Sequence, residues 1–275
     1  MRGEASRIAD RTSRDTLAPQ LRSAGDDAWR IGNELFSFTN ALDHNVRLER
    51  ALTDVSRPAA DKVAVLRTLI GDQAHPTTMT ILSDLVARRW SRAADIANAV
   101  EDFGVDAMMY YADSTGQTLR VSVELAELHS ALLNLSVVRS RLYDDTVPAE
   151  ARLKLLHSVL DGSDFCTITV RLAEHATCNL RHRRYLATIQ WLITKFSRHM
   201  GESLVTVTTA TPLTPTQIDA LSRAYAARLG HAVHINPVVD PTVLGGMRIQ
   251  VGHEVTDNTV VAQLQHLRRQ VATSA

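Results

Sequence analysis

"DPTVLGGMRIQVGHEVTDNTV", residues 240–260, decides the fold of the C-terminal part of the chain. It reads as a turn, a pair of glycines, an alternating strand, a second turn and the start of a helix. In "MRIQV", Met247, Ile249 and Val251 alternate with Arg248 and Gln250. This period of two predicts a half-buried β-strand, and "EVT" after it predicts a short return strand.

The paired glycines, Gly245 and Gly246, precede a basic residue and raise the question of a phosphate-binding loop. Neither GxxxxGK[ST] nor GxGxxG is present, and a strand follows, so no helix N-terminus is available to hold phosphate. Glycines beside a strand more often mark a bulge or a close backbone approach. We therefore interpret both as backbone-packing residues, and expect Gly252 to turn the chain and Asp257 or Asn258 to cap a last helix.

The rest of the C-terminal region follows the same reasoning. "LVTVTTATPL" and "HAVHINPVV" alternate as strands do. Between them, Thr214 and Gln217 form a capping box around Pro215, and Gly230 ends the helix. The last helix is expected to bury Val260, Leu264, Leu267 and Val271. Residues 201–275 thus predict a β-α-β-β-α unit, too small to house a nucleotide fold.

Residues 1–200 instead carry apolar residues at helical spacing, and they contain an internal repeat. A shift of ninety positions aligns Glu34-Leu35, Ala41-Leu42, Leu52, Asp54, Pro58-Ala59 and Leu66 with Glu124-Leu125, Ala131-Leu132, Leu142, Asp144, Pro148-Ala149 and Leu156. Chance similarity between amphipathic helices is the alternative, but one offset holds across the link and the proline, which favours duplication. The fold class predicted is mainly α with a small α/β C-terminal domain. Its parts are two helical bundles related by duplication, 1–104 and 105–200, then the unit at 201–275.

The composition of the chain excludes several classes of function. Thirty basic and thirty acidic residues balance to zero, which argues against a general nucleic-acid binder. Two cysteines, Cys166 and Cys178, are expected to be reduced thiols of a cytoplasmic protein. No run of 18 apolar residues and no signal-peptide core occurs, so membrane association is expected only through partners.

No catalytic, cofactor or metal site is predicted. His175, Cys178 and His182 share a helix face, but two helical turns span about 10.5 Å, whereas zinc–ligand bonds are about 2.0–2.3 Å. A buried cysteine between half-buried histidines is the preferred interpretation. The basic cluster "RHRRY", residues 181–185, is interpreted as a solvated helix terminus, with a partner contact or nucleic-acid binding as alternatives.

These residues together resemble the delta subunit of bacterial F-type ATP synthase, counterpart of the mitochondrial oligomycin-sensitivity-conferring protein. "VTVTTATPLTPTQ" and "VDPTVLGGMRIQVGHEVTDNTVVAQLQHL" carry the most specific likeness. The characteristic positions of the family's C-terminal pattern are Asp240, Pro241, Gly245, Gly246, Gly252 and Asp257.

The helical part is similar more loosely, through "AMMYYADSTGQTLRVSVEL" and the links Pro148 with Arg152 and Pro58 with Lys62. A usual member has one helical bundle. Two bundles resemble the extended delta subunits of actinobacteria, and the second copy matches better. The first helix of copy one, "DTLAPQLRSAG", is degenerate, with Pro19 inside it.

The resemblance implies a non-catalytic subunit of the rotary proton-translocating ATP synthase, in the peripheral stalk on the cytoplasmic face of the cell membrane. It implies that the N-terminal helix of the alpha subunit binds the second bundle, expected near Ala107, Tyr110 and Tyr111. The C-terminal end of the b subunit is expected around Leu264 and Leu267. The alternative is a free-standing helical adaptor or regulatory protein that reuses this domain.

Overall fold

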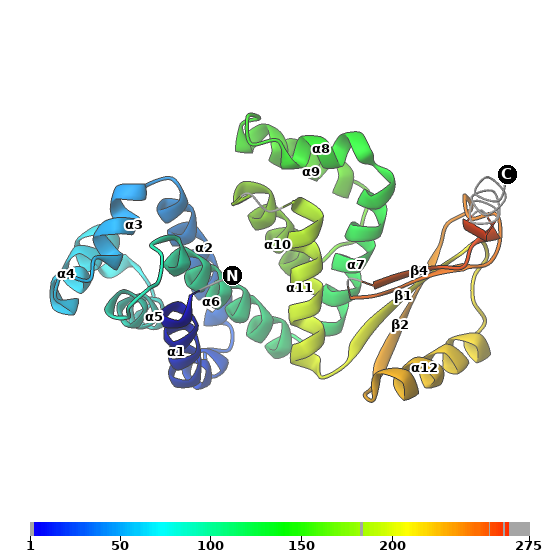
Figure 1. Cartoon of the computed structure of the whole chain (residues 1–275), viewed down its shortest axis with the longest axis horizontal. Coiled ribbons are helices and arrows are strands. Elements are labelled where there is room, and N and C mark those ends of the chain that lie inside the picture. The colour runs from blue at the N-terminus through cyan, green and yellow to red at the C-terminus, as the bar shows by residue number, and fades with distance from the viewer. Residues whose placement is uncertain (1–2, 182–183, 253, 261, 264–275) are drawn as a thin grey trace, which may run out of the picture. The chain divides into compact units, whose positions relative to one another are not determined.

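The computed structural model describes residues 3–181, 184–252, 254–260 and 262–263. They form a mainly helical chain with one small four-stranded sheet near the C-terminus, which confirms the predicted fold class (Figure 1). The chain divides into two compact units: residues 1–117 with 170–182, and residues 118–169 with 183–275.

The helices confirm the duplication. The first repeat comprises α1 (Glu4–Arg22), α2 (Asp27–Asp43), α3 (Val46–Thr53), α4 (Ala59–Ile70), the 3-10 turn η1 (Gly71–Gln73), α5 (Pro76–Ala87) and α6 (Ala94–Ser114). The second comprises α6 again, α7 (Thr118–Asn134), α8 (Ser136–Tyr143), α9 (Ala149–Leu160), α10 (Thr167–Cys178) and α11 (Tyr185–Met200). Corresponding helices keep the predicted offset, since α3 and α8 begin at 46 and 136, and α4 and α9 at 59 and 149.

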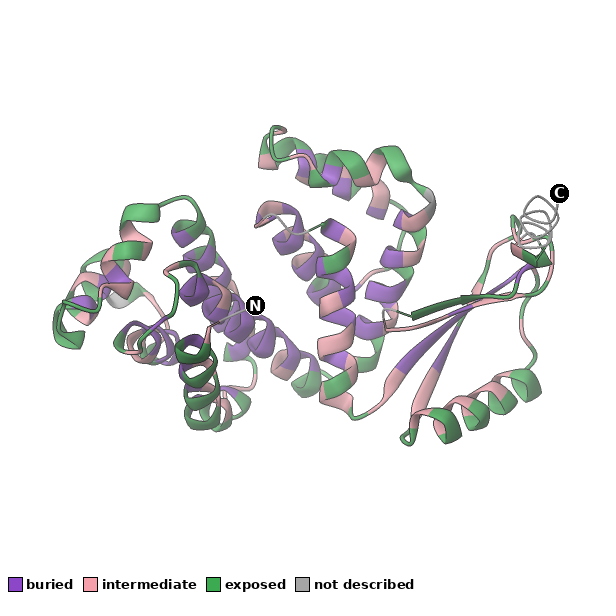
Figure 2. Ribbon diagram, in the orientation of Figure 1, coloured by how far each residue is buried: buried purple, intermediate pink, exposed green. Residues whose placement is uncertain are grey.

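Helix α6 counts in both repeats, as the sixth helix of the first and the first helix of the second. It runs straight through residues 104 and 105, where the first bundle was expected to end. It is buried on almost every side, as Figure 2 shows by its nearly continuous purple ribbon. The division into 1–104, 105–200 and 201–275 stays a prediction, and the two compact units are cut at other positions.

The link before the fourth helix is built alike in both repeats. Asp54 Oδ1 accepts the backbone N–H of Ser56 at 2.8 Å, and Asp144 Oδ1 accepts that of Thr146 at 3.0 Å. Pro58 and Pro148 then stand directly before α4 and α9. A proline suits this place because the first turn of a helix has no partner for a backbone N–H.

The aligned leucines form the cores of the repeats. Each is at most 1% exposed: Leu35, Leu42, Leu52 and Leu66 in the first copy, and Leu125, Leu132, Leu142 and Leu156 in the second. The periodicity in the sequence therefore identified the inward faces of these helices correctly.

The C-terminal unit contains β1 (Ser203–Thr209), α12 (Pro215–Leu229), β2 (Val233–Val239), β3 (Met247–Val251) and β4 (Glu254–Asp257). The strand order is β2-β1-β3-β4, with β1 and β2 parallel and the other pairs antiparallel. The three strands of the predicted β-α-β-β-α unit, the short return strand at "EVT" and the helix between the first two strands are all present.

Helix α12 covers one face of this sheet (Figure 1). Its predicted capping box at Thr214 and Gln217 is present, and Gly230 ends it in the left-handed conformation. The core beneath it joins buried Val205, Val207, Ile235 and Ile249 to partly buried Leu213, Ile218, Leu221 and Tyr225. Within the same unit, α11 and α7 also contact β1, and Gln250 donates to Gln190 at 2.8 Å.

The start of the last helix differs from the expectation. The hydroxyl oxygen of Thr259 accepts the backbone N–H of Ala262 at 3.3 Å, so Thr259, rather than Asp257 or Asn258, is the N-terminal cap. Asp257 is the last residue of β4, and its carboxylate accepts the N–H of Thr259. Val260 is 42% exposed rather than buried, and Leu264, Leu267 and Val271 lie outside the described residues.

Across the described part of the chain, no single helix is long and apolar enough to cross a membrane. Helices α7 and α8 reach that length and hydropathy only as a pair, bent by 109° at the break between them.

Candidate partner-binding surfaces

Backbone hydrogen bonds and a close backbone contact join the loop between β2 and β3 to the start of the last helix. Gly246 has a φ of +77°, and a Cβ built on it would lie 2.3 Å from the carbonyl oxygen of Asn258. The carbonyl oxygen of Gly245 accepts the N–H of Val260 at 3.1 Å, and that of Met247 accepts the N–H of Asn258 at 3.0 Å. Only glycine leaves room for this approach at position 246.

Asp240 in this loop and Asp257 after it accept hydrogen bonds from backbone N–H groups. Asp240 Oδ1 accepts the N–H of Thr242 at 2.9 Å and its hydroxyl at 2.6 Å. The hydrogen bond from Thr259 holds the pKa of Asp257 below its ordinary value. Gly252, with a φ of +58°, turns the chain between β3 and β4. Asp240, Pro241, Gly245 and Gly246 therefore belong to the loop between β2 and β3, Gly252 to the turn between β3 and β4, and Asp257 to the link before the last helix.

This loop exposes apolar side chains next to its packed glycines. Leu244 is 76% exposed, and Val239 and Val260 are 47% and 42% exposed. A Cβ on Gly245 would lie 3.4 Å from a methyl group of Val260, so Leu244 and Val260 flank the same backbone. We call Val239, Leu244 and Val260 the loop patch.

The residues expected to meet the alpha subunit have mixed exposure. Ala107 is fully buried in the core of the first unit, so it offers no surface. Tyr110 and Tyr111 are half-buried near the C-terminal end of α6. The Arg22 guanidinium lies 5.5 Å from the ring centre of Tyr110, and the ring of Trp29 lies 5.4 Å from that of Tyr111. Leu264 and Leu267, expected to meet the b subunit, lie outside the described residues.

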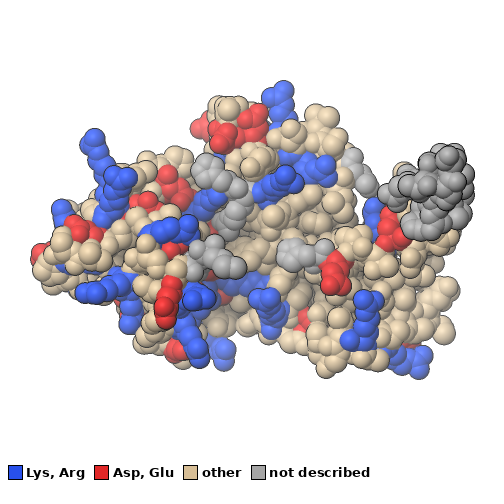
Figure 3. Space-filling view, viewed as in Figure 1, with Lys and Arg blue, Asp and Glu red and all other residues tan. Residues whose placement is uncertain are grey.

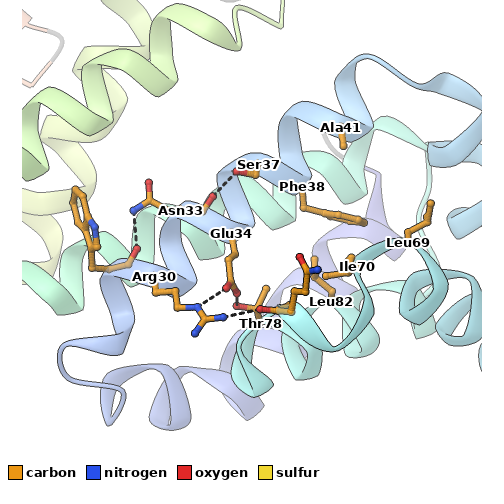
Figure 4. Close-up of a pocket in the computed structure, with 13 residues that line it drawn as sticks. Arg30, Asn33, Glu34, Ser37, Phe38, Ala41, Leu69, Ile70, Thr78 and Leu82 are labelled. Carbon is orange, nitrogen blue, oxygen red and sulfur yellow. Dashed lines mark hydrogen bonds and ion pairs between the residues drawn. The ribbon is translucent and has the colours of Figure 1, made fainter.

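A groove of about 660 Å³ opens between α2, α4, η1 and α5 in the first repeat (Figure 4). Its apolar lining consists of Trp29, Phe38, Ala41, Leu69, Ile70, Ala74 and Leu82. Its polar side holds Arg30 and Glu34 of α2, whose ion pair measures 2.8 Å. Sequence reasoning did not find this groove, because it is assembled from three helices that are separate in the chain.

The ion pair beside the groove also holds the start of α5 by hydrogen bonds, and we call Arg30 and Glu34 the clamp. Glu34 Oε2 accepts the N–H of His75 at 2.9 Å and the hydroxyl of Thr78 at 2.6 Å. Arg30 also donates to the carbonyl oxygen of Gln73 at 2.6 Å. Burial alone would raise the pKa of Glu34, but the hydrogen bonds from Thr78, His75 and Arg30 hold it below 4.5.

The second repeat contains the same clamp. Arg120 Nε donates to Glu124 at 2.6 Å and Nη2 to the carbonyl oxygen of Asp164 at 2.5 Å. Glu124 Oε2 accepts the N–H of Cys166 at 2.9 Å, immediately before α10. The sequence analysis used the recurring Glu-Leu pair only to align the repeats; "RIGNEL" beside "RVSVEL" is the signal that could have predicted this contact.

The basic cluster at 181–185 differs from the predicted solvated terminus. The side chain of Arg181 is 11% exposed and donates to Asp43 at 2.7 Å and to Glu101 at 3.2 Å. Tyr185 is 1% exposed. The interpretation of a solvated terminus was wrong for both residues. For Arg181 the reason is that its carboxylate partners lie 138 and 80 residues away in the sequence, where a local pattern cannot find them. Of the remaining cluster, His182 and Arg183 lie outside the described residues.

His175, Cys178 and His182 are the residues that were weighed as zinc ligands, and His182 lies outside the described residues. The described residues contain no group of three or more His, Cys, Asp or Glu side chains that could hold a metal ion. His175 is 3% exposed and Cys178 is half-buried, the reverse of the predicted buried cysteine between half-buried histidines, and neither Cys166 nor Cys178 forms a disulfide. On the face drawn in Figure 3, Lys and Arg are interspersed with Asp and Glu over the first unit.

The fold and the loop define a class: duplicated helical bundles followed by a small sheet unit closed by an Asp-Pro and Gly-Gly loop. The sequence pattern of the family described as ATP synthase delta (OSCP) subunit matches residues 105–271, more than half of the chain. The chain belongs to this family, as its sequence predicted, and is a peripheral-stalk subunit of the ATP synthase.

Relatives match over nearly the whole chain, first repeat included. ATP synthase subunit delta of Bifidobacterium adolescentis is 75% identical over 275 residues, 100% of each chain. The proteins of the same name from Streptomyces avermitilis and Beutenbergia cavernae are 33% and 32% identical, each over 98% of both chains. A chain of the Toxoplasma gondii mitochondrial ATP synthase hexamer matches 61% of this chain over 94% of its own length, at 20% identity and with a TM-score of 0.34.

Replacing Glu34 with alanine is expected to lower the free energy of unfolding by about 1–3 kcal/mol, because buried donors at the start of α5 lose their acceptor. Urea unfolding at pH 7 measures the loss. Since the pKa of Glu34 is lowered from 4.5, its contribution is present above pH 4.5 and is lost as the pH falls through the lowered pKa. Glu150→Ala, at an exposed position in the first turn of α9, is the control and should cost at most about 1 kcal/mol. Equal losses in the two variants would contradict the clamp.

Gly246→Ala is expected to cost about 2–4 kcal/mol, because the new Cβ meets backbone and the residue has a positive φ. Gly252→Ala is the matched control, since its φ is also positive but no atom lies within 4 Å of the added Cβ. It should cost only about 1–2 kcal/mol. Thermal unfolding compares the two, and a smaller effect at Gly246 than at Gly252 would overturn the packing argument.

Proposed function

We propose that this chain joins the catalytic head of the ATP synthase to the membrane-anchored stalk. In this proposal it binds the N-terminal helix of the alpha subunit through its helical bundles and the C-terminal end of the b subunit through its C-terminal unit. It is a peripheral protein at the cytoplasmic face of the membrane, held there by its partners. The observation that carries the proposal is the pairing of a duplicated bundle with the signature loop in one chain of this family.

The alpha contact is assigned to the end of α6, as the sequence suggested. Tyr110 and Tyr111 are half-buried there and lie beside Arg22 and Trp29. Aromatic and arginine side chains are the residues most enriched at energetically important interface positions. Because Ala107 is fully buried, the contact would use the tyrosines and their neighbours rather than Ala107.

The b contact is assigned to the loop patch and to the continuing helix with Leu264 and Leu267. Leu244 and Val260 are exposed beside a loop whose backbone is packed at Gly246, and Val239 is exposed at the end of β2, directly before this loop. A binding surface that is ordered before binding loses less entropy when the partner binds. The end of an amphipathic helix is a partner of matching chemistry.

The proposed mechanism is mechanical and uses no reactive group of this chain. A stator must hold the head still while the rotor turns, so its interfaces must dissociate slowly. The stabilising contacts inside each repeat, above all the clamps at the start of α5 and α10, would keep the bundles from deforming under load.

The competing proposal is a free-standing adaptor that reuses this fold. The two are distinguished by purifying the chain from solubilised membranes. Recovery together with alpha and b subunits supports the stator, and recovery with neither would reject it.

Tyr111→Ala is expected to weaken binding of a peptide from the alpha N-terminus by about tenfold or more, because an aromatic anchor is lost. Isothermal titration of the full chain gives the dissociation constants. Tyr143→Ala removes the same side chain from α8, where Tyr143 is 42% exposed, and should leave affinity unchanged. Equal affinity of the Tyr111 variant and the parent chain would reject the assigned site.

Leu244→Asp is expected to abolish co-purification of the b subunit without lowering the melting temperature, since the side chain is 76% exposed. A charge placed in an apolar contact must be desolvated without a partner. Leu69→Asp, at a 55% exposed leucine of the first unit, is the matched control and should retain the b subunit. Retention of b by both variants would place the contact elsewhere.

A further inference from the structure

The groove between α2, α4, η1 and α5 has the length and the walls of a site for one helix (Figure 4). Its residues on α2 run from Trp29 to Ala41, a rise of about 18 Å along the helix axis. A helix of about three turns has nearly the same length. The opposite wall presents Leu69, Ile70 and Leu82, and Leu69 is 55% exposed. An amphipathic helix that docks into such a groove covers the exposed leucine with its apolar face.

The groove is formed before a partner binds, because the clamp lies in its wall. Glu34 accepts the hydroxyl of Thr78 on α5, and Arg30 donates to the carbonyl oxygen of Gln73 in η1. All four residues line the groove. These hydrogen bonds fix α5 and η1 against α2. A surface that is ordered in advance loses less entropy when a partner binds.

The clamps of the two repeats differ in one side chain, and the difference leaves Arg30 with unused donors. In the second repeat, Nη2 of Arg120 donates to the carbonyl oxygen of Asp164 and, at 3.2 Å, to its carboxylate. In the first repeat the residue that supplies this carbonyl oxygen is Gln73, which has no carboxylate. The side chain of Arg30 is 57% exposed, and its Nη1 has no acceptor among the residues that the structure describes.

Unused guanidinium donors at the edge of an apolar groove suit a carboxylate. Arginine presents its N–H groups in a planar fork that matches the two oxygens of a carboxylate. Glu34 occupies Nε of Arg30, so an incoming carboxylate would pair at Nη1. The helix that fits this groove therefore carries an acidic residue beside its apolar face. That residue would supply the charge that Asp164 supplies in the second repeat.

The groove is continuous with the contact assigned to the alpha subunit. Trp29 lines the groove, and its ring centre lies 5.4 Å from that of Tyr111. Tyr111, Trp29 and the rest of the groove all belong to the first compact unit. A helix that contacts Tyr111 is thus separated from the groove by a single side chain.

We propose that the groove receives the N-terminal helix of an alpha subunit, with its apolar face on Leu69 and an acidic side chain on Arg30. This inference rests on the proposed function and adds the first repeat to the alpha contact. The extra repeat then enlarges the interface with the catalytic head. Since affinity differences between related interfaces arise mostly in the dissociation rate, the larger contact would hold the head for longer.

Isothermal titration of the full chain with a synthetic peptide of the alpha N-terminus tests the groove. Leu69→Asp is expected to weaken binding about tenfold or more, because the new carboxylate is buried without a partner. Val46→Asp is the matched control, since Val46 is 54% exposed in the same unit and is not among the groove residues. It should leave the affinity unchanged. Both variants should keep the melting temperature of the parent chain, because both side chains are exposed.

A second pair of variants tests the carboxylate at Arg30 and keeps the clamp intact. Gln73→Asp gives the first repeat the carboxylate that Asp164 gives the second, so Arg30 gains an internal partner that competes with the peptide. The affinity is expected to fall about threefold or more. Gln73→Asn has a side chain of the same length without the charge, and it should bind the peptide at least about threefold more tightly than Gln73→Asp. Equal affinities of these two variants would overturn the pairing at Arg30.

The outcomes distinguish a failure of the groove from a failure of the proposed function. Weaker binding in both Tyr111→Ala and Leu69→Asp supports one continuous contact. Binding that Tyr111→Ala weakens but Leu69→Asp does not would keep the alpha contact and overturn the groove. Absence of peptide binding to the parent chain would reject both. Self-association of the parent chain that Leu69→Asp abolishes, measured by sedimentation, would assign the groove to a second copy of the chain and overturn the proposal.

Discussion

The carboxylate on the second helix of each repeat is the interaction on which the bundles depend. The first backbone N–H groups of a helix have no partner within the helix, and they are costly to bury without one. Glu34 and Glu124 supply that partner from another helix, at 2.9 Å in both repeats. An arginine one turn earlier, Arg30 or Arg120, fixes the carboxylate and also holds the carbonyl before the fifth helix. The start of the fifth helix, and with it one wall of the groove in Figure 4, is therefore fixed by two side chains.

Local features of the sequence were sufficient for much of the fold. The strands of the C-terminal unit and α12 follow from alternation, a capping box and a terminal glycine, which all act within a few residues. The paired leucines at an offset of ninety likewise identified the cores of both repeats. The assignment of the N-terminal cap was off by one to two residues, because Asp257 was already engaged in the turn that precedes Thr259.

Long-range polar contacts account for what the sequence did not predict. Helix α1 buries Ser6 and Ser13 completely, and their hydroxyls donate to Asp95 at 2.7 Å and Asp84 at 2.5 Å. An apolar pattern cannot identify a helix face made of serines. Arg14 similarly pairs with Asp102 and Asp106 on α6, about ninety residues away. The family resemblance suggested Ala107, Tyr110 and Tyr111 as contact residues, but it could not show that Ala107 is fully enclosed.

Because α6 belongs to both repeats, the two repeats do not depend on each other equally. A duplication that shares a helix adds five helices to the chain rather than six, and only the second repeat ends in a helix of its own. Removing the residues before α6 leaves every helix of the second repeat in the chain, whereas removing those from α6 onward takes the sixth helix from the first. The family pattern starts at residue 105, inside this shared helix. The second repeat thus keeps all its helices without the residues before α6, although its α10 packs against α2 of the first repeat, and the first repeat cannot be completed without α6.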